Sequence, residues 1–525
     1  MGRSSRTARL LAACSTALVL VVGACADGDG AASDQPDGAE PSPVSGGVLR
    51  LAIERPEHLD PALARSVPQS ELIVADLLFD GLTAYDDQRA KVVPALAERW
   101  GASADQRRWR FRLREDATFA SGKEITAAEV KASLDRITAE GSASPAAPGL
   151  ARITKVSATQ ADLVTIALDA PLATLPEVLS NPALGIVPAS AGPVGTKRFD
   201  LAPDGSGPFV LADDDNGLRG DDAIRLRRAR GADTLLDGVE LQIHEELADA
   251  AAAVRQSEAD WSLVPDDELG AEEKGRSDDP FAAMLFYGLN ANHPDLGDVR
   301  FRQAIVRAID RESILEEVYD GTLVPRNGVV PIGVPGAAED PCGERCAFDP
   351  ERARALVKAL YPSGGVPTVA IDHDDGRHQQ QVAEAIESDL EAVGIPAEPR
   401  SRPFLSYIDF VGDDSQEMFR LGSTGAYPSA DAYLSPLFAA AGADDAVGLT
   451  QPNVEAALAE ARSTPDPEQR FRLLARVERL TMREIPVVPL GQFRTPSLQS
   501  DRTQDLELSL TGTFDAPAVW LSPNP

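Results

Sequence analysis

The chain has 525 residues and carries 50 Lys and Arg against 83 Asp and Glu, a formal net charge of −33 at pH 7. This acidity argues against nucleic acid as a partner, because the phosphates would be repelled. The length exceeds the roughly 250–300 residues at which one hydrophobic core stops growing, so two or three domains are expected.

The N-terminus has the three parts of a secretory signal peptide. Three arginines and no acid precede an apolar run over residues 10–22, and small residues then lead to Cys25. A signal-anchor helix is the alternative, but the run is shorter than the roughly 20 residues that a bilayer core requires. A second candidate, Cys14, leaves almost no hydrophobic segment ahead of it. We therefore predict a signal peptide over residues 1–24 and a lipid on Cys25, as at a bacterial lipobox.

A tether and then alternating strands and helices are predicted after the signal. Residues 25–47 consist of Asp, Gly, Ser and Pro with hardly an apolar side chain, which predicts a disordered tether. Thr126 and Glu129 predict a capping box, which opens a helix with one apolar face. Short apolar or alternating runs predict strands over residues 48–53, 109–113, 163–168, 224–226 and 239–243.

The second half of the chain continues this pattern. A continuous apolar run over residues 284–289 predicts a buried strand, and residues 366–372 predict another. Asp349 and Pro350 are an N-cap and a first helical residue, and that helix ends near residue 360. Further helices are predicted over residues 299–309, 311–319, 379–393 and 471–485. Strands that alternate with helices indicate α/β architecture. No apolar stretch after the signal is long enough to cross a bilayer, so we expect a soluble body.

Cys342 and Cys346 are the only cysteines of the mature chain besides Cys25. Outside the membrane such a pair predicts a small disulfide rather than a reactive site. Zinc would need three or four ligands, and no nearby histidine or second cysteine pair supplies them.

Several short segments between residues 46 and 496 follow one another in a characteristic order. They are Gly-Gly-Val-Leu-Arg-Leu-Ala (46–52), Leu-Asp-Pro-Ala (59–62), Phe-Asp-Gly-Leu-Thr-Ala-Tyr-Asp (79–86), Val-Pro-Ala-Leu-Ala-Glu-Arg-Trp (93–100), the block 109–136, Ser-Gly-Pro-Phe (206–209), Leu-Asn (289–290) and the block 299–311. In this order and spacing they resemble the family 5 extracytoplasmic solute-binding proteins, the peptide, dipeptide and nickel binders of ABC importers.

The resemblance implies a two-lobed α/β fold of the periplasmic-binding-protein type (type II), with a hinge between the lobes. Lobe 1 would comprise residues 48–285 and 486–525, including an extra subdomain over about 76–190, and lobe 2 would comprise residues 286–485. The chain would cross between the lobes near residues 287–290 and 486–489. The solute would lie between the lobes, where small-molecule sites are common and hinge closure is a known mode of capture.

The resemblance also implies the partners and the place of action. The protein would be a monomer without enzymatic activity or cofactor, lipid-anchored to the outer face of the cell membrane. It would deliver a peptide or another small solute to the ABC permease subunits in that membrane.

Two other functions stay open from the sequence. A secreted hydrolase would need a reactive motif, but the chain has no Gly-x-Ser-x-Gly elbow, no His-Glu-x-x-His and no Walker loop. A glycosidase would need a pair of catalytic carboxylates, and so acidic a chain offers many such pairs. An envelope lipoprotein with this fold could instead serve as a regulator or assembly factor, because fold alone does not assign function.

The segment 373–378 suggests chemistry, because two histidines and three nearby acids could ligate a metal. A five-residue step, however, does not stack His373 and His378 on one helix face. The alternative is a polar strand-to-helix loop. In relatives that bind peptides, basic side chains for the carboxylate end of the solute lie roughly here. His373, Arg377 and His378 are therefore candidate contacts for an anionic group.

The segment 422–434 departs from the peptide binders that it resembles. In those relatives it carries a Trp and, three residues on, an Asp that pairs with the α-ammonium group of the peptide. Ser423 and Ala426 stand at the matching positions. A buried ammonium without a carboxylate costs several kcal/mol, so either Asp431 replaces the anchor or the solute has no free amino terminus. Asp431 as a cap of the turn over residues 432–438 is the alternative.

The remaining candidate contacts complete the predicted site. Gly425, Ala426 and Tyr427 lie between Ser423 and Asp431. His58 stands beside the Leu-Asp-Pro-Ala segment, and Tyr287 lies at a predicted lobe crossing. We expect a modified peptide or another polar anionic solute rather than a plain dipeptide.

Overall fold

A computed structural model describes residues 42–65, 69–212, 217–220, 222–265, 273–411, 415–439, 447–449 and 451–523. The predicted signal peptide, Cys25 and residues 26–41 of the predicted tether lie outside these ranges. From Pro43 onward the chain forms one compact unit. Within the described ranges, no helix combines the length and the apolar character that crossing a membrane requires.

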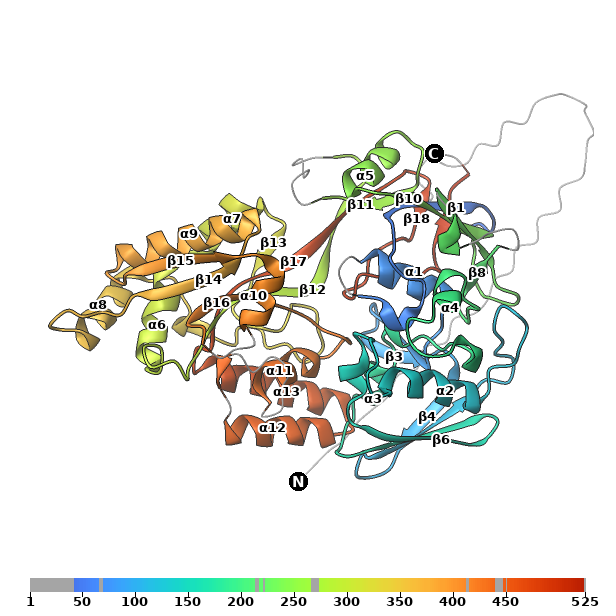
Figure 1. Cartoon of the computed structure of the whole chain (residues 1–525), viewed down its shortest axis with the longest axis horizontal. Helices are drawn as coiled ribbons and strands as arrows, with labels where there is room; N and C mark the ends of the chain where they lie inside the picture. The colour runs from blue at the N-terminus through green and yellow to red at the C-terminus, as the bar shows by residue number, and fades with distance from the viewer. Residues whose placement is uncertain are drawn as a thin grey trace, which may run out of the picture. The chain divides into compact units, whose positions relative to one another are not determined.

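One large mixed sheet runs through the compact unit. Its strands follow the order β15 (Ala397–Arg402), β14 (Val369–Asp374), β16 (Met418–Thr424), β12 (Arg276–Leu289), β17 (Val487–Gln499), β11 (Trp261–Leu263), β1 (Val48–Glu54), β10 (Gly238–His244), β9 (Ala223–Arg228) and β8 (Phe209–Leu211), and β13 (Leu323–Pro325) also pairs with β17. Some helices pack against this sheet, and others lie away from it against a smaller sheet (Figure 1). The predicted α/β architecture is therefore confirmed.

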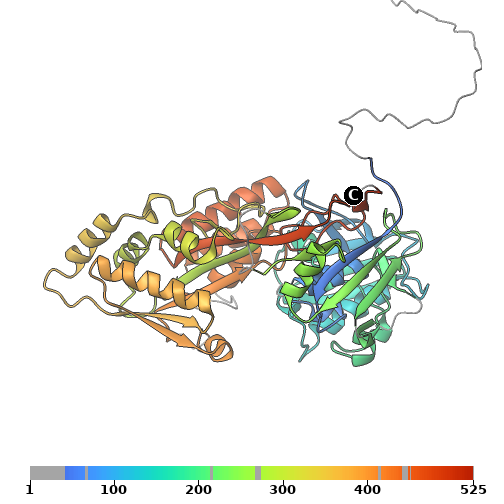
Figure 2. The same cartoon turned by 90° about the horizontal axis from the view of Figure 1, so that it is seen from above.

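β12 and β17 are the two longest strands and connect the two halves of the sheet. They pair antiparallel from Arg276 opposite Leu498 to Gly288 opposite Val487, and Figure 2 shows them side by side. The apolar run predicted as a buried strand is the second half of β12, which is buried from Phe281 to its end. The strand begins earlier than predicted. Its first residues are polar and half-buried, so an apolar run does not reveal them.

β17 was not predicted, and its prolines are the reason. Pro489 and Pro496 lie inside the strand, although proline cannot donate a ladder hydrogen bond. Pro489 stands opposite Phe286, where the register of the β12–β17 ladder shifts. A register irregularity of this kind is where a strand accommodates proline.

The first lobe packs helices and small sheets against the β1 end of the large sheet. Its main core includes Leu51, Phe79, Phe209 and Trp261, all nearly inaccessible to solvent. The elements around this core are α1 (Ser70–Leu78), α4 (Lys197–Leu201), α5 (Leu247–Arg255), β18 (Thr503–Gln504) and β19 (Trp520–Leu521).

A separate core lies within the first lobe, in the region of the predicted subdomain. The antiparallel sheet β4 (Ala97–Ala102), β5 (Arg108–Leu113), β7 (Leu163–Leu168) and β6 (Ile153–Gln160) packs against α2 (Ala127–Thr138). The hairpin β2 (Thr83–Asp86) and β3 (Lys91–Pro94) and the short α3 (Leu175–Val178) complete it. The core side chains of α2 are those of the predicted apolar face, Ala127, Val130, Leu134 and Ile137.

The capping box predicted at the start of α2 is wrong. Thr126 is the N-cap by backbone position, but its side chain makes no capping bond. Glu129 instead accepts a hydrogen bond from the backbone N–H of Ala189 and pairs with Lys123. The carboxylate thus ties α2 to a loop of the same lobe.

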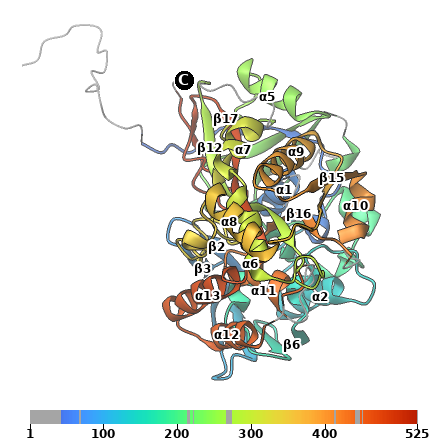
Figure 3. The ribbon, with the colours of Figure 1, turned by 90° about the vertical axis from the view of Figure 1, so that its left-hand side faces the viewer.

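The second lobe is built on β14, β15 and β16 and has one continuous core. That core extends along the chain from Ala282 to Leu490. Asp349 caps the third of its helices through the N–H of Arg352, as predicted. The helices are α6 (Val299–Ala308), α7 (Arg311–Tyr319), α8 (Pro350–Leu360), α9 (Arg377–Ala392), α10 (Phe404–Val411), α11 (Asp431–Phe438), α12 (Pro452–Ser463) and α13 (Pro467–Met482). α12 and α13 lie side by side (Figures 1 and 3).

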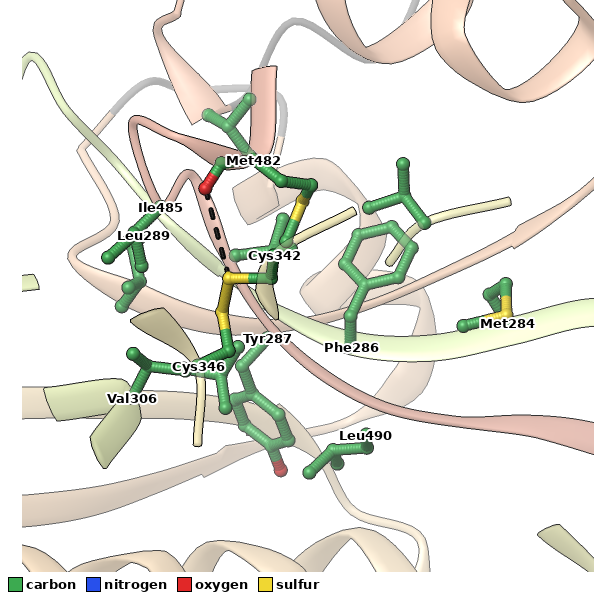
Figure 4. Packing of buried hydrophobic residues seen from close by; sticks show 14 of the residues in the cluster. Met284, Phe286, Tyr287, Leu289, Val306, Cys342, Cys346, Met482, Ile485 and Leu490 are labelled. Atoms are coloured by element: carbon green, nitrogen blue, oxygen red, sulfur yellow. Dashed lines mark hydrogen bonds between the residues drawn. A yellow bond between two sulfur atoms is a disulfide. The ribbon is translucent and has the colours of Figure 1, made fainter. Parts of the chain in front are cut away.

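The cysteine pair lies within this second core. Cys342 and Cys346 form a disulfide with a Cα–Cα distance of 5.6 Å. Both side chains are buried among apolar residues, and the sulfur of Cys342 lies 3.9 Å from the carbonyl oxygen of Met482 (Figure 4). The disulfide therefore holds its short loop against the end of α13.

Candidate solute-binding site

A pocket opens where the two lobes meet at the crossing strands. It has about 470 Å³ of atom-free space, part of which is open to solvent. Its walls are Leu72, Tyr85 and residues 180–182 from the first lobe, Phe281, Ala282, Leu510 and Thr511 from β12 and the C-terminal segment, and residues 424–428 from the second lobe. The predicted contacts Gly425, Ala426 and Tyr427 are among these residues.

Close packing explains the glycine at position 425. A Cβ atom there would lie 2.5 Å from the ring and hydroxyl atoms of Tyr433. The hydroxyl of Tyr433 donates a hydrogen bond of 2.6 Å to the carbonyl oxygen of Ala282, another pocket residue. Gly425 thus lets the loop after β16 pass directly over a buried tyrosine that is bonded to β12.

Asp431 is buried and already has a cationic partner. Its side chain is 2% exposed, and its Oδ1 accepts a hydrogen bond of 3.0 Å from Nε of Arg462. The hydroxyl of Tyr427 donates to Oδ2 at 3.0 Å, and the hydroxyl of Ser435 donates to Oδ1. The predicted capping role is wrong, because Asp431 is the first residue of α11 and Ala430 is the N-cap. The role of Asp431 that the structure shows is that of an internal ion-pair partner.

Three polar contacts join the lobes beside the pocket. The Asn181 side-chain amide donates to the carbonyl oxygen of Ala426 at 2.7 Å. The N–H of Ala173 donates to the carbonyl oxygen of Arg462 at 2.7 Å. Nη2 of Arg470 donates to Oε1 of Glu177 at 2.7 Å.

The ion pair between Glu177 and Arg470 is largely withdrawn from water. The two side chains are 12% and 3% exposed. Burial raises the pKa of the Glu177 carboxyl, and the charge of Arg470 opposes this shift. Since one partner comes from α3 and the other from α13, the pair ties the first lobe to the second.

The carboxyl ends of β14 and β16 point toward the pocket side of the second lobe. β16 is antiparallel to β12 and parallel to β14, and β16 ends at Thr424, which lines the pocket. In α/β sheets, ligands bind outside the carboxyl ends of the strands. Of the side chains at these two strand ends, that of Thr424 lines the pocket itself, whereas Asp374 at the end of β14 does not.

Basic side chains gather at these strand ends. Nη1 of Arg420, on β16, lies 3.6 Å from Oδ2 of Asp374, the last residue of β14. Arg377 is exposed at the first turn of α9, directly after β14. The ring of His378 lies 5.4 Å from that of Tyr319. Of this group, Arg420 was not predicted, although an arginine between apolar residues within a strand is a sequence signal.

Several polar atoms in this region have no hydrogen-bond partner among the described residues. They are the hydroxyl of Tyr287, Oδ2 of Asp374, Nε of Arg420 and the hydroxyl of Ser423. Tyr287 stands directly opposite Arg420 in the β12–β16 ladder. An unsatisfied buried polar group costs roughly 1–3 kcal/mol, so such atoms usually meet water or a ligand.

The other predicted contacts lie deeper or elsewhere. His373 is 1% exposed, belongs to β14 rather than to a loop, and its Nδ1 lies 2.7 Å from the carbonyl oxygen of Asp374. Tyr287 is fully buried and does not line the pocket. His58 pairs with Asp200 at 2.8 Å within the first lobe. His373 and His378 are not part of the metal-type cluster found in the described ranges.

Comparison with solved structures shows that the chain shares the two-lobed fold of periplasmic binding proteins. HbpA2 from Haemophilus parasuis matches with a TM-score of 0.79 and 20% identity, covering 91% of this chain and 100% of that chain. The unliganded open form of the periplasmic murein tripeptide binding protein MppA matches with 0.78 and 21% identity, covering 92% and 99%. DppA from Helicobacter pylori, in complex with the peptide STSA, matches with 0.70 and 20% identity, covering 91% and 98%.

The sequence comparison identifies the family. The model of bacterial extracellular solute-binding proteins, family 5 (Middle), matches residues 91–445. Glutathione-binding protein GsiB of Escherichia coli (strain K12) is 26% identical over 474 residues, 86% of this chain and 88% of the relative. The chain belongs to the family 5 extracellular solute-binding proteins, as the resemblance predicted.

Proposed function

We propose that this chain is the lipid-anchored solute-capturing subunit of an ABC importer and that it binds a small peptide-like solute with an anionic group. The pocket between the lobes is the observation that carries this proposal, because first-lobe, crossing-strand and second-lobe residues all line it. Relatives named for glutathione, murein tripeptide and peptide binding support a solute of the size of a short peptide. The predicted lipobox at Cys25 supports the anchor.

The packing of the core clusters supports lobe boundaries close to the predicted ones. Ala282 and Leu490 already pack in the second-lobe core, whereas Leu498 packs in a first-lobe cluster with Ala52. We place the hinge in the middle of β12 and β17, close to residues 281 and 491–496, slightly nearer the first lobe than the predicted crossings.

The solute does not bring an ammonium group to Asp431. Arg462 already neutralises this carboxylate, and Tyr427 and Ser435 occupy further lone pairs. A second cation there would be placed beside a buried guanidinium, where like charges repel. This supports a solute whose amino group is absent, blocked or bound elsewhere.

The anionic group of the solute binds at the strand ends of the second lobe. Arg420 supplies a guanidinium that is only 22% exposed, with Nε unsatisfied. A guanidinium suits carboxylates because two parallel N–H groups can donate to two oxygens. Arg377, at the N-terminal end of α9, adds positive charge, and the dipole of this helix also favours an anion there.

A ligand screen by thermal unfolding tests the proposed function. Binding to the folded state stabilises it by RT ln(1 + [L]/Kd), about 2.7 kcal/mol at a hundredfold excess over Kd. Glutathione, murein-type tripeptides, and di- to pentapeptides with free or acetylated amino termini are the compounds to compare. We expect a rise in Tm with an anionic member, no preference for a free amino terminus and no turnover. Hydrolysis of the ligand would contradict the proposal, as would stable capture of envelope enzymes without any solute.

Arg420→Gln tests the anionic contact. We expect a loss of affinity of about tenfold or more, since a charge-assisted hydrogen bond contributes roughly 1.5–3 kcal/mol. Arg400→Gln is the control, because Arg400 pairs with Glu398 on the exposed edge strand. Equal affinity in the Arg420→Gln variant, with an unchanged Tm, would refute the assignment.

A further inference from the structure

His293, Asp295 and Glu417 form a cluster away from the solute pocket. One donor atom from each side chain lies within 4.8 Å of the other two. The three residues come from the loop between β12 and α6 and from the residue before β16. β16 separates Glu417 from the pocket residue Thr424, a distance of roughly 20 Å at 3.3 Å per residue. The cluster is therefore independent of the proposed solute site.

The backbone holds the cluster in place. The N–H of Asn290 donates to the carbonyl oxygen of Glu417 at 3.0 Å, which joins the loop to the start of β16. The N–H of Ala370 donates to Oε2 of Glu417 at 3.2 Å, which leaves Oε1 directed to the histidine. The N–H of His293 donates to the carbonyl oxygen of Asn290 at 3.1 Å, so a turn fixes the position of the ring.

The spacing is too long for hydrogen bonds and suits a bridging cation. Nε2 of His293 lies 4.0 Å from Oε1 of Glu417, beyond the usual hydrogen-bond range. Two ligands of one tetrahedral zinc ion, each at about 2.0–2.2 Å, lie roughly 3.3–3.6 Å apart, so the two side chains approach each other by about 0.5 Å to share the ion. Asp295 is exposed and free to close the remaining gap by side-chain rotation.

The charge of the cluster also favours a cation. Among the described residues, no Lys or Arg lies within ion-pair distance of Asp295 or Glu417, and the histidine is the only basic partner of Glu417. Arg400 acts on Glu417 at longer range but is hydrogen-bonded to Glu398 at 2.7 Å. Two carboxylates thus face one imidazole without a full counter-charge.

We infer that His293, Asp295 and Glu417 form a binding site for zinc or a similar first-row divalent ion, with water completing the coordination. One imidazole and two carboxylates suit such an ion better than calcium, which prefers oxygen ligands alone. Binding through Nε2 places the ring proton on Nδ1, so the long 3.4 Å hydrogen bond that Nδ1 accepts from the N–H of Asp295 is given up. The ion links the β12–α6 loop to β16 and stabilises the second lobe.

Calorimetric titration of the tag-free mature chain with zinc chloride tests this inference. We expect one saturable site, a higher Tm with zinc, and an affinity loss of roughly tenfold or more in both His293→Ala and Glu417→Gln. Glu417→Gln keeps an acceptor for Ala370, so the fold is preserved, and His244→Ala on β10 is the matched control.

Three results would overturn the inference. The first is the absence of saturable zinc binding to the parent chain. The second is a zinc affinity of His293→Ala and Glu417→Gln equal to that of the parent chain. The third is a loss of zinc affinity in His244→Ala as large as that in the two cluster variants. A zinc-edge anomalous peak next to His293 would confirm the site directly. Solute binding does not depend on these residues, so failure here leaves the proposed function unaffected.

Discussion

Replacing Asp431 by Asn distinguishes two possible roles of this residue, that of an internal ion-pair partner and that of a solute anchor. The variant leaves the guanidinium of Arg462 without its hydrogen-bonded carboxylate, and this side chain is only 12% exposed. Removing one partner of a buried pair typically costs 3–5 kcal/mol. Because Asn retains an acceptor oxygen, we expect the lower end, about 3 kcal/mol. For an unfolding unit of 150–250 residues this lowers Tm by roughly 6–12 °C.

A double-mutant cycle gives the sharper measurement. Arg462→Met removes the charge that Asp431→Asn leaves unpaired, so the double variant should be more stable than the sum of the single effects predicts. We expect a coupling energy of about 2 kcal/mol by scanning calorimetry. Asp409→Asn, on the exposed face of α10, is the control and should change stability by less than about 0.5 kcal/mol.

Solute affinity decides between the two roles. If Asp431 serves the fold alone, the folded Asp431→Asn variant binds solute as tightly as the parent chain. Unchanged stability together with a large loss of affinity for peptides with a free amino terminus would refute the ion-pair reasoning and restore an ordinary amine anchor.

Three further predictions concern other parts of the chain. Mass spectrometry of membrane-extracted protein should find a lipidated N-terminus at Cys25, and Cys25→Ala should release the chain from the membrane; an unmodified chain beginning elsewhere would contradict the anchor. Burial and the neighbouring carboxylates of Asp80, Asp515 and Asp87 raise the pKa of Asp76 to about 7, so the folded state retains a proton that the unfolded chain releases near pH 4. Stability is lost as pH rises through this window, and Asp76→Asn should raise Tm at pH 8 but not at pH 4.5; an equal effect at both pH values would contradict this. Glu478→Ala should cost about 3–5 kcal/mol, because the fully buried carboxylate accepts bonds from the N–H groups of Val329, Val330 and Ala338; a stability loss below about 1 kcal/mol would contradict it.

Local patterns predicted much of the second lobe. The helix after Asp349 begins where the N-cap and Pro350 place it, because the side chain of Asp349 bonds to the N–H of Arg352 three residues on. The helix predicted over residues 311–319 has the same bounds in the structure. The apolar run after residue 281 is a buried strand because no polar group interrupts it.

Long-range pairing decided what local patterns could not. β17 carries two prolines that argue against a strand, yet its pairing with β12 outweighs them. Glu129 fits a capping box in sequence but bonds to Ala189, which is 60 residues away. The capping-box pattern considers only residues close in the chain, so it does not include a distant partner such as Ala189.

The sequence by itself determined the family, the α/β class and the pocket segment at Gly425, because these depend on the order of motifs and on local periodicity. Only the tertiary structure showed which charged groups lie beside Asp431 and Arg420. Whether a charged group can meet a solute depends on which other charges the fold brings within a few ångströms. Arg462 is 31 residues from Asp431 in the chain and 3.0 Å from it in space. Arg420 faces Oδ2 of Asp374, which has no hydrogen-bond partner, from a neighbouring strand. Electrostatic interactions depend on these distances in space, and spacing along the chain does not give them.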